Sequence, residues 1–216
     1  MERSCVFCDR SQFEERLIFE NREWNVIATL GQITDGGYVL IVPREQVPCM
    51  GAFDLRTHSQ IGSLLRVGHE VIRAVSIEYQ NSFVRKPYPV TLFEHGIVGQ
   101  TIKHAHLHVL PAVIDFTPKV RIDFPKAKIQ ELKYAAHLQA LYQDNPRPYL
   151  FWTTPSGKGT VCWNPAALSQ CLRIVAAEFL GRLERANWRN MDPELDKRLW
   201  QETVQRLKPY FRHRPL

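Results

Sequence analysis

Hydrophobic positions recur at two different spacings along the first half of this chain of 216 residues. Short runs rich in β-branched and aromatic residues predict strands at residues 16–20, 24–28, 38–42 and 88–93. Between residues 53 and 77 the apolar positions recur every three to four residues, which predicts a long helix. The first half is therefore expected to combine several short strands with one long helix.

The second half shows the same two spacings in a different order. A helix is expected over residues 126–143, before a hairpin of two strands at 148–152 and 160–163. Another helix is expected from Pro165 to Leu183, because proline is favoured in the first turn of a helix. A last helix is expected over about 193–211, with its apolar face packed on the body of the protein.

The most unusual stretch lies between the two halves, over residues 99–111, and reads Gly-Gln-Thr-Ile-Lys-His-Ala-His-Leu-His-Val-Leu-Pro. Its three histidines, His104, His106 and His108, alternate with apolar residues. Alternate residues of a strand share a face, so the three imidazoles are expected to point the same way. The intervening apolar residues are expected to point into the protein; they are Ala105, Leu107 and Val109.

Three explanations fit such a row of histidines. It can be the polar face of a surface strand, a metal site in which imidazoles are the ligands, or a nucleophilic site in which one imidazole attacks phosphorus. Gly99, Gln100 and Thr101 directly precede the row and offer a flexible turn, an amide and a hydroxyl, which suit an anionic phosphate. The flanking residues therefore favour phosphate chemistry.

Composition and charge narrow the class of protein. Apolar residues make up 44% of the chain, and no apolar run is long enough for a transmembrane helix. The amino terminus lacks a signal-peptide core, so we expect a cytoplasmic protein that does not bind membranes. The net charge of +6 favours an anionic ligand. No basic stripe with interleaved aromatics is present, so a small nucleotide is expected as the ligand and no specific nucleic acid.

Two further patterns suggest ligand-binding groups. Cys5 and Cys8 have the spacing of a zinc knuckle, which needs two more ligands, although such a pair can also be redox-active or structural. Lys158 lies between glycines and Arg173 lies near a helix start, and both positions suit an anion. These two cations are expected either to close over a substrate phosphate or to be solvated surface charges.

The stretch Gly-Gln-Thr-x-x-His-Ala-His-Leu-His-Val-Leu closely resembles the signature of the histidine triad (HIT) superfamily of nucleotide hydrolases and transferases. The resemblance covers about residues 4–112. It implies an α+β, HIT-like fold, an antiparallel sheet with a long helix, over residues 1–115. Residues 116–216 would form an α/β extension that packs on this domain and completes the wall of the active site. Relatives of the Hint type are often two-fold dimers, so a homodimer is possible.

The same resemblance implies a role for each histidine. His106, in the middle, would attack the α-phosphorus and form a covalent nucleotidyl-histidine that water then resolves. His108 would help to protonate the leaving group, and His104 would orient its neighbour or bind zinc. Transferase relatives carry glutamine at the third position, so His108 favours hydrolysis. Gly99, Gln100 and Thr101 would hold the phosphate oxygens.

Several positions differ from the Hint pattern, among them Gln46, Leu30 and Phe93. In the zinc-bearing branches the Cys-x-x-Cys pair joins two histidines, one of them at the position of His104, but Gln46 stands at the usual place of the other. We therefore expect zinc on Cys5, Cys8 and His104 with an unassigned fourth ligand, for which Cys49 could serve only if its loop bends back. Phe93 stands where Hint-type members have an asparagine that contacts phosphate. His95 is expected to replace that asparagine, or to be a structural loop histidine.

The expected activity is hydrolysis of the P–N bond of nucleoside 5′-phosphoramidates of the AMP type, including aminoacyl or peptidyl nucleotides. An amine leaves poorly without a proton, and the retained third histidine can supply one. The alternatives are cleavage of the P–O–P bond of a dinucleoside polyphosphate, by water or by phosphate, and a nucleotide-binding module without turnover. A zinc hydrolase with three histidine ligands would leave the Gly-Gln-Thr turn and the two cysteines unexplained.

Overall fold

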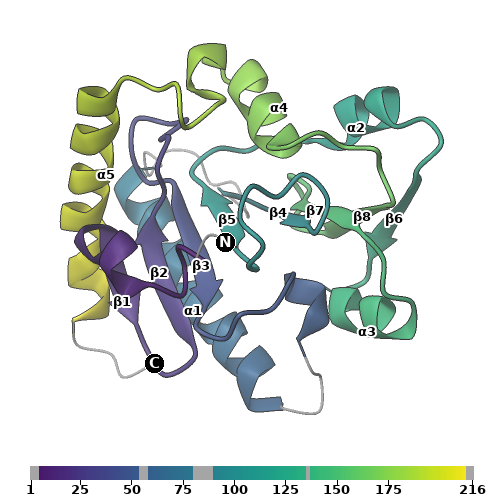
Figure 1. Ribbon diagram of the computed structural model, residues 1–216, viewed down its shortest axis with the longest axis horizontal. Coiled ribbons are helices and arrows are strands. Elements are labelled where there is room, and N and C mark those ends of the chain that lie inside the picture. Colours follow the sequence, from purple (N-terminus) through teal and green to yellow (C-terminus); the bar gives the residue numbers. More distant parts are fainter. Residues whose placement is uncertain (1–4, 54–57, 80–89, 135–136, 213–216) are drawn as a thin grey trace.

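The computed structural model describes residues 5–53, 58–79, 90–134 and 137–212 (Figure 1). Its centre is one sheet of eight strands in the order β1-β2-β3-β5-β4-β7-β8-β6, and every neighbouring pair is antiparallel. The strands are β1 (Leu17–Glu20), β2 (Trp24–Ala28), β3 (Val39–Pro43), β4 (Thr91–Gly96), β5 (Leu107–Leu110), β6 (Lys128–Leu132), β7 (Tyr149–Thr153) and β8 (Gly159–Trp163). The predicted α+β class, an antiparallel sheet with a long helix, is confirmed.

The helices in the described part of the chain are α1 (His58–Tyr79), α2 (Thr117–Asp123), α3 (His137–Asp144), α4 (Cys171–Phe179) and α5 (Pro193–Leu207). Short 3-10 turns lie at η1 (Arg10–Gln12), η2 (Glu14–Arg16), η3 (Met50–Ala52), η4 (Leu183–Arg185) and η5 (Lys208–Phe211). None of the helices in these ranges is long and apolar enough to cross a bilayer.

The expected helix over 126–143 is wrong in its first half, which forms β6. The backbone of this segment pairs with β8 at five positions, from Lys128 opposite Trp163 to Leu132 opposite Gly159. The edge of β8 offers main-chain hydrogen bonds to this segment, and the apolar spacing of the segment gives no sign of them. The pairing with β8 outweighs the local preference for a helix. The helix expected at 165–183 also begins later, at Cys171, because Asn164 and Gln170 have positive φ values of 50° and 64°.

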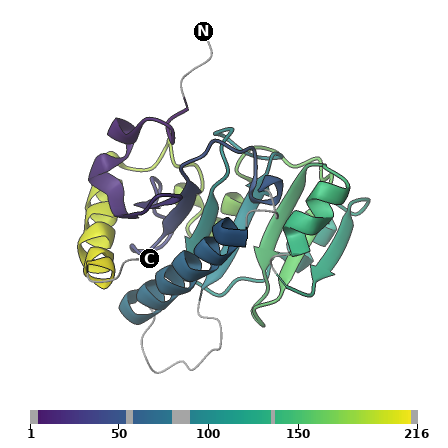
Figure 2. The same cartoon turned by 90° about the horizontal axis from the view of Figure 1, so that it is seen from below.

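Different elements cover the two faces of the sheet. On one face α1 and α5 bury the apolar residues of β1–β3, and α3 packs against β7 and β8 (Figure 2). On the other face the segment over residues 5–13 covers β1–β3, while α2 and α4 cover β4 and β7. The side chain of His108 lies on this second face, as does that of Phe93, which stacks on it. The histidines therefore lie where the amino-terminal cover meets the carboxy-terminal one.

The second half of the chain extends the sheet of the first half without a break. β7 pairs with β4 at four positions, from Phe93 opposite Trp152 to Gly96 opposite Tyr149. In Figure 1 β7, β8 and β6 continue the sheet on the side away from β1. A division into a domain over residues 1–115 and an extension over 116–216 remains a prediction about sequence segments, since both share this one sheet.

Candidate active site

The three histidines of the triad lie in the middle of the sheet and are all buried. Their exposed fractions are 0% for His104, 6% for His106 and 4% for His108. Only His108 belongs to β5; the other two precede the strand, where Ala105 N donates to the carbonyl of Val47 at 2.8 Å. The expectation of one strand through all three is therefore corrected. Because the histidine face is covered, the row is not the polar face of a surface strand.

Main-chain carbonyls hold the first two imidazoles. Nδ1 of His106 lies 2.7 Å from the carbonyl oxygen of His104, and Nε2 of His104 lies 2.8 Å from that of Pro43. A carbonyl only accepts, so each of these nitrogens carries the proton. The opposite nitrogen of each neutral ring, Nε2 of His106 and Nδ1 of His104, therefore presents a lone pair.

His108 is held by two aromatic residues. Nδ1 lies 2.7 Å from the hydroxyl of Tyr38, and the ring stacks on Phe93 with a centroid distance of 4.3 Å and an interplanar angle of 4°. The ring of His106 lies 5.0 Å from it at an angle of 64°. Nε2 of His108 is buried and has no hydrogen-bond partner among the described residues. Phe93 thus packs against the third histidine and, unlike the asparagine of Hint-type members, has no polar group to offer a phosphate.

His95 joins the triad from the neighbouring strand. It lies on β4, its ring centroid is 5.8 Å from that of His108, and it is 2% exposed. Nε2 of His95 accepts a hydrogen bond of 3.1 Å from the main-chain N–H of Leu172, in the first turn of α4. The proton of the neutral ring is therefore on Nδ1. The sequence-based placement of His95 beside the triad agrees with this geometry, and its role as a phosphate donor stays a prediction.

The Gly-Gln-Thr turn contacts the second half of the chain. Gly99 has a φ of +78°, and its carbonyl accepts from Gln170 N at 2.8 Å. A Cβ at Gly99 would come within 2.9 Å of the His95 ring, so glycine is required here for two reasons. Nε2 of Gln100 donates to the carbonyl of Pro48 at 2.8 Å, and the partly exposed Thr101 follows in the same turn.

The structure brings Arg173 close to the histidines. Its side chain is 4% exposed, and its guanidinium lies 5.3 Å from the ring centroid of Tyr38. It donates to the carbonyls of Gly31 at 2.9 Å and of Ala186 at 3.4 Å. In the described part of the chain no carboxylate forms an ion pair with Arg173. The position therefore holds a buried positive charge next to the site.

The structure does not bring Lys158 to the histidines. Lys158 lies in the turn between β7 and β8, and its ammonium pairs with Glu131 at 2.9 Å, where both side chains are more than half exposed. His95 is opposite Leu150, at the other end of β7. Three residues of strand, about 10 Å, separate Leu150 from Thr153, which precedes the turn. A solvated ion pair accounts for this lysine.

Burial lowers the pKa of all four histidines. Desolvation lowers the pKa of His106 to about 4, although its hydrogen bond to the His104 carbonyl opposes the change. Desolvation, with the charges of His106 and Arg173, lowers the pKa of His95 to about 3. The pKa values of His104 and His108 are lowered too, mainly by burial. Neutral imidazoles of this kind can act as nucleophiles or metal ligands near neutral pH.

A cluster that suits a metal ion lies at one end of the site. Nδ1 of His104 is 3.4 Å from Sγ of Cys5 and 3.6 Å from Sγ of Cys8, and the three ligand atoms lie within 4.8 Å of one another. These separations resemble the edges of a tetrahedron with metal–ligand bonds of about 2.1–2.3 Å. Oε1 of Gln46 is 3.5 Å from Sγ of Cys8, and its Nε2 donates to the carbonyl of Lys103. Gln46 therefore turns its oxygen toward the cluster.

Phe7, between the two cysteines, covers the triad from the amino-terminal side. Its ring centroid is 5.7 Å from that of His104 and 5.4 Å from that of His106, and the side chain is 6% exposed. Sequence reasoning missed this residue, as it missed the contact between Tyr38 and His108. The only available signal for Phe7 was its place inside the Cys-x-x-Cys pair.

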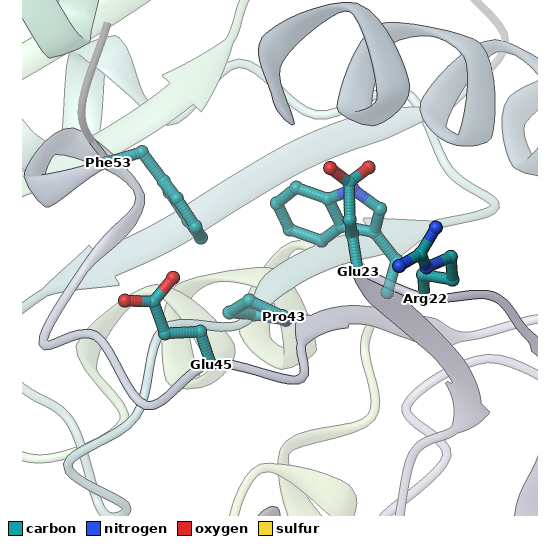
Figure 3. Close-up of a pocket in the computed structure, with 6 residues that line it drawn as sticks. Arg22, Glu23, Pro43, Glu45 and Phe53 are labelled. Atoms are coloured by element: carbon teal, nitrogen blue, oxygen red, sulfur yellow. The ribbon is translucent and has the colours of Figure 1, made fainter. Parts of the chain in front are cut away.

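A small pocket lies elsewhere, at the ends of β2 and β3 (Figure 3). Its volume is about 150 Å³, and it is lined by Arg22, Glu23, Trp24, Pro43, Glu45 and Phe53. None of the residues expected in the active site is among these six. The pocket has two carboxylates and one guanidinium, so its charge does not favour a phosphate.

Residues 11–113 match the family model described as the HIT domain. The chain therefore contains a domain of the histidine triad (HIT) superfamily. This HIT domain spans β1 to β5 and contains the three histidines, Gly99 and Gln100, whereas Cys5, Cys8 and Arg173 lie outside the matched range. A comparison with curated proteins gives no significant match.

Several solved structures of other proteins resemble part of the chain. SMU.412c from Streptococcus mutans UA159 is 20% identical, with 67% of this chain and 84% of that one covered and a TM-score of 0.42. A HIT family member from Bacillus subtilis is 18% identical, with 51% and 74% covered and a TM-score of 0.42. The protein ST2152 from Sulfolobus tokodaii strain7, described as a hypothetical histidine triad nucleotide-binding protein, is 20% identical, with 50% and 68% covered and a TM-score of 0.39.

Proposed function

We propose that this HIT protein hydrolyses the P–N bond of nucleoside 5′-phosphoramidates of the AMP type, with His106 as the nucleophile. One observation carries the proposal. The hydrogen bond from Nδ1 of His106 to the carbonyl of His104 leaves the lone pair on Nε2, in a buried site where the ring is neutral. An imidazole fixed in this tautomer is a good nucleophile toward phosphorus.

The reaction takes two steps. Nε2 of His106 forms a bond to the α-phosphorus, the P–N bond breaks, and the amine leaves with an added proton. A water molecule then attacks the same phosphorus, the bond to His106 breaks, and the nucleoside monophosphate is released. His108, with its ring 5.0 Å from that of His106, is the proposed proton donor to the amine.

The substrate's phosphate would lie against the Gly-Gln-Thr turn. Gly99, Gln100 and Thr101 lead into the triad and offer main-chain and side-chain donors to its oxygens. His95, with its proton on Nδ1, is a further proposed donor. The buried charge of Arg173 would favour an anion here, since a nearby positive charge attracts one strongly where water is excluded.

Zinc is the proposed occupant of the cysteine cluster, with a structural role. Cys5, Cys8 and His104 would be ligands, with the oxygen of Gln46 as the fourth. The hydrogen bond from Nε2 of His104 to the carbonyl of Pro43 orients the ring, since metal-binding histidines are commonly held by a carbonyl that accepts from their other ring nitrogen. The ion would fasten the amino-terminal segment to the triad and thereby hold Phe7 in place.

A panel of substrates tests the function. The protein is incubated with AMP amides of ammonia, alkylamines and amino acids, and with dinucleoside polyphosphates, with and without added phosphate. The products are then identified by mass spectrometry. AMP and free amine as the main products would support the proposal. Release of a nucleoside diphosphate from the dinucleotides alone would favour P–O–P cleavage, and tight AMP binding without any product would favour a binding module.

A further inference from the structure

The hydrogen bond between Tyr38 and His108 links the triad to a residue outside its strand. The hydroxyl of Tyr38 and Nδ1 of His108 are 2.7 Å apart, and the two side chains are 0% and 4% exposed. Tyr38 directly precedes β3, and His108 is opposite Leu40 of that strand. The contact is thus fixed by the register of the sheet, and water does not compete with it.

The surroundings of Tyr38 determine the direction of this hydrogen bond. The guanidinium of Arg173, next to the ring, has only donors, so it cannot accept the phenolic proton. Among the hydrogen bonds of the described residues, Nδ1 of His108 is the acceptor that the Tyr38 hydroxyl has. Tyr38 therefore donates, and the neutral His108 ring carries its proton on Nε2.

The ring of His108 cannot turn to satisfy Nε2 elsewhere. Phe93 stacks on one side of it, and His106 and His95 approach it with tilted rings at 5.0 Å and 5.8 Å. Nε2 is buried and unpartnered among the described residues, which is costly for a polar group unless a ligand completes it. The N–H group is thus left without a partner in a ring that lies beside His106, where the substrate would bind.

A neutral imidazole has a difficulty as a proton donor. If it loses its Nε2 proton alone it becomes an imidazolate, a very strong base. The difficulty disappears if Nδ1 gains a proton in the same step. Tyr38 holds such a proton, and the phenolate left behind would lie beside the buried guanidinium of Arg173. Arg173 lacks a carboxylate partner among the described residues, so its charge is available to that phenolate.

We propose that Tyr38 fixes His108 as the Nε2–H tautomer and supplies the proton that His108 passes to the leaving amine, with Arg173 stabilising the resulting phenolate. This inference rests on the proposed function. It makes Tyr38 a positioning residue that acts through His108, and it assigns Arg173 a part beyond attracting the substrate. It also names the substrate class that needs the arrangement: nucleotides with a basic amine as leaving group.

The protons balance over the two steps. As the bond from Nε2 of His106 to phosphorus forms and the P–N bond breaks, His108 gives its Nε2 proton to the amine nitrogen. In the same step Nδ1 of His108 receives the hydroxyl proton of Tyr38. When water attacks phosphorus and the bond to His106 breaks, Nε2 of His108 takes a proton from the water. Nδ1 then returns its proton to the phenolate, and the starting state is restored.

The first test reads the tautomer directly and needs no substrate. Nitrogen-15 NMR of the imidazoles distinguishes a protonated Nε2 from a protonated Nδ1 in the full chain. We expect His108 as the Nε2–H form in the wild type and a gain of the Nδ1–H form in Tyr38→Phe. A wild-type His108 in the Nδ1–H form, or an unchanged tautomer in Tyr38→Phe, would overturn the proposal.

The second test compares two leaving groups, an alkylamine in an AMP amide and 4-nitrophenol in an AMP ester, which leaves without a proton. For Tyr38→Phe we expect kcat to fall by about 10²-fold on the amide and by less than about 3-fold on the ester, as for loss of assisted proton transfer. Tyr210→Phe is the matched control, since its hydroxyl bonds Glu78 at 2.6 Å away from the site, and both rates should stay unchanged. Equal losses on the two substrates, or no loss, would contradict the proposal.

The two tests separate this inference from the function on which it rests. If the wild type turns over neither substrate, the proposed hydrolysis is wrong, whereas the imidazole spectra still decide whether Tyr38 sets the tautomer. If the wild type cleaves the amide and Tyr38→Phe cleaves it equally well, the hydrolysis stands and the relay through Tyr38 is wrong.

Discussion

The main-chain N–H of Leu172 donates to Nε2 of His95 over 3.1 Å, and this bond joins the first turn of α4 to the strand beside the triad. A second bond, from Gln170 N to the carbonyl of Gly99, joins the residue before α4 to the Gly-Gln-Thr turn. The second half of the chain thus fixes both a histidine and the turn that is proposed to bind phosphate.

Loss of the acceptor at His95 should destabilise the protein. In His95→Leu the buried N–H of Leu172 has no partner, which should lower the free energy of unfolding by about 1–3 kcal/mol. His95→Gln keeps a side-chain oxygen that can accept the bond, so it should lose clearly less. Urea unfolding at pH 7 measures both. Equal losses for the two variants would show that the bond does not hold α4 in place.

Glu94 should make the stability depend on pH. It is fully buried, accepts from Met50 N at 2.7 Å and from the hydroxyl of Tyr149, and has Cys49 nearby. Desolvation raises the pKa of Glu94 from 4.5 to about 7, although its two hydrogen bonds oppose the change. The raised value means that the folded state binds a proton more tightly than the unfolded state does.

Between pH 4.5 and 7 the unfolded chain ionises at Glu94 while the folded one does not, so stability is lost as the pH rises through this window. The change in pKa corresponds to at most about 3 kcal/mol. Glu94→Gln does not titrate, so the unfolding free energy of the wild type minus that of Glu94→Gln should fall from pH 4.5 to 8. A difference that stays constant with pH, in denaturant unfolding at each pH, would refute this account.

The cysteine cluster predicts a graded response of zinc binding to changes at Cys5, Cys8 and Gln46. Cys5→Ser and Cys8→Ser should lose bound zinc, because each removes a thiolate ligand. Gln46→Ala should release zinc to a chelator more readily than the wild type, and Gln46→His should hold it more tightly, since imidazole is the better ligand. Cys171→Ser, outside the cluster, is the control. Elemental analysis measures the zinc bound to each variant, and a chelator titration measures how readily that zinc is lost. If Gln46→Ala retains zinc as well as the wild type does, Gln46 is not a ligand.

Local patterns along the chain predicted the strands of the HIT domain well, because their apolar runs and turns carry the information themselves. The prediction failed at β6, whose hydrogen-bond partner β8 lies more than 25 residues further along the chain. No local pattern could show that β7 would pair with β4 or that α4 would cover the histidines. For the same reason Arg173 and Lys158 looked alike in sequence, although the fold buries one beside Tyr38 and leaves the other in a surface ion pair.

The site shows the same limit. The alternation of histidines with apolar residues predicted the shared environment of the triad, and Gly99 was expected from its place in a turn. The hydrogen bonds that distinguish the three imidazoles come from Pro43, from the His104 carbonyl and from Tyr38. These partners are set by sheet register and by the bend before β5, so the tautomers of the histidines could be derived only from the fold.

The covalent intermediate on His106 is the most direct test of the proposed chemistry. Protein mixed with an excess of an AMP amide is quenched with base during turnover, digested, and searched by mass spectrometry for a nucleotidyl group. We expect the adduct on the peptide that contains His106. His106→Asn should give no adduct and no turnover, while it binds AMP as tightly as the wild type does. Wild-type-like turnover by His106→Asn, or an adduct on another residue, would contradict the account.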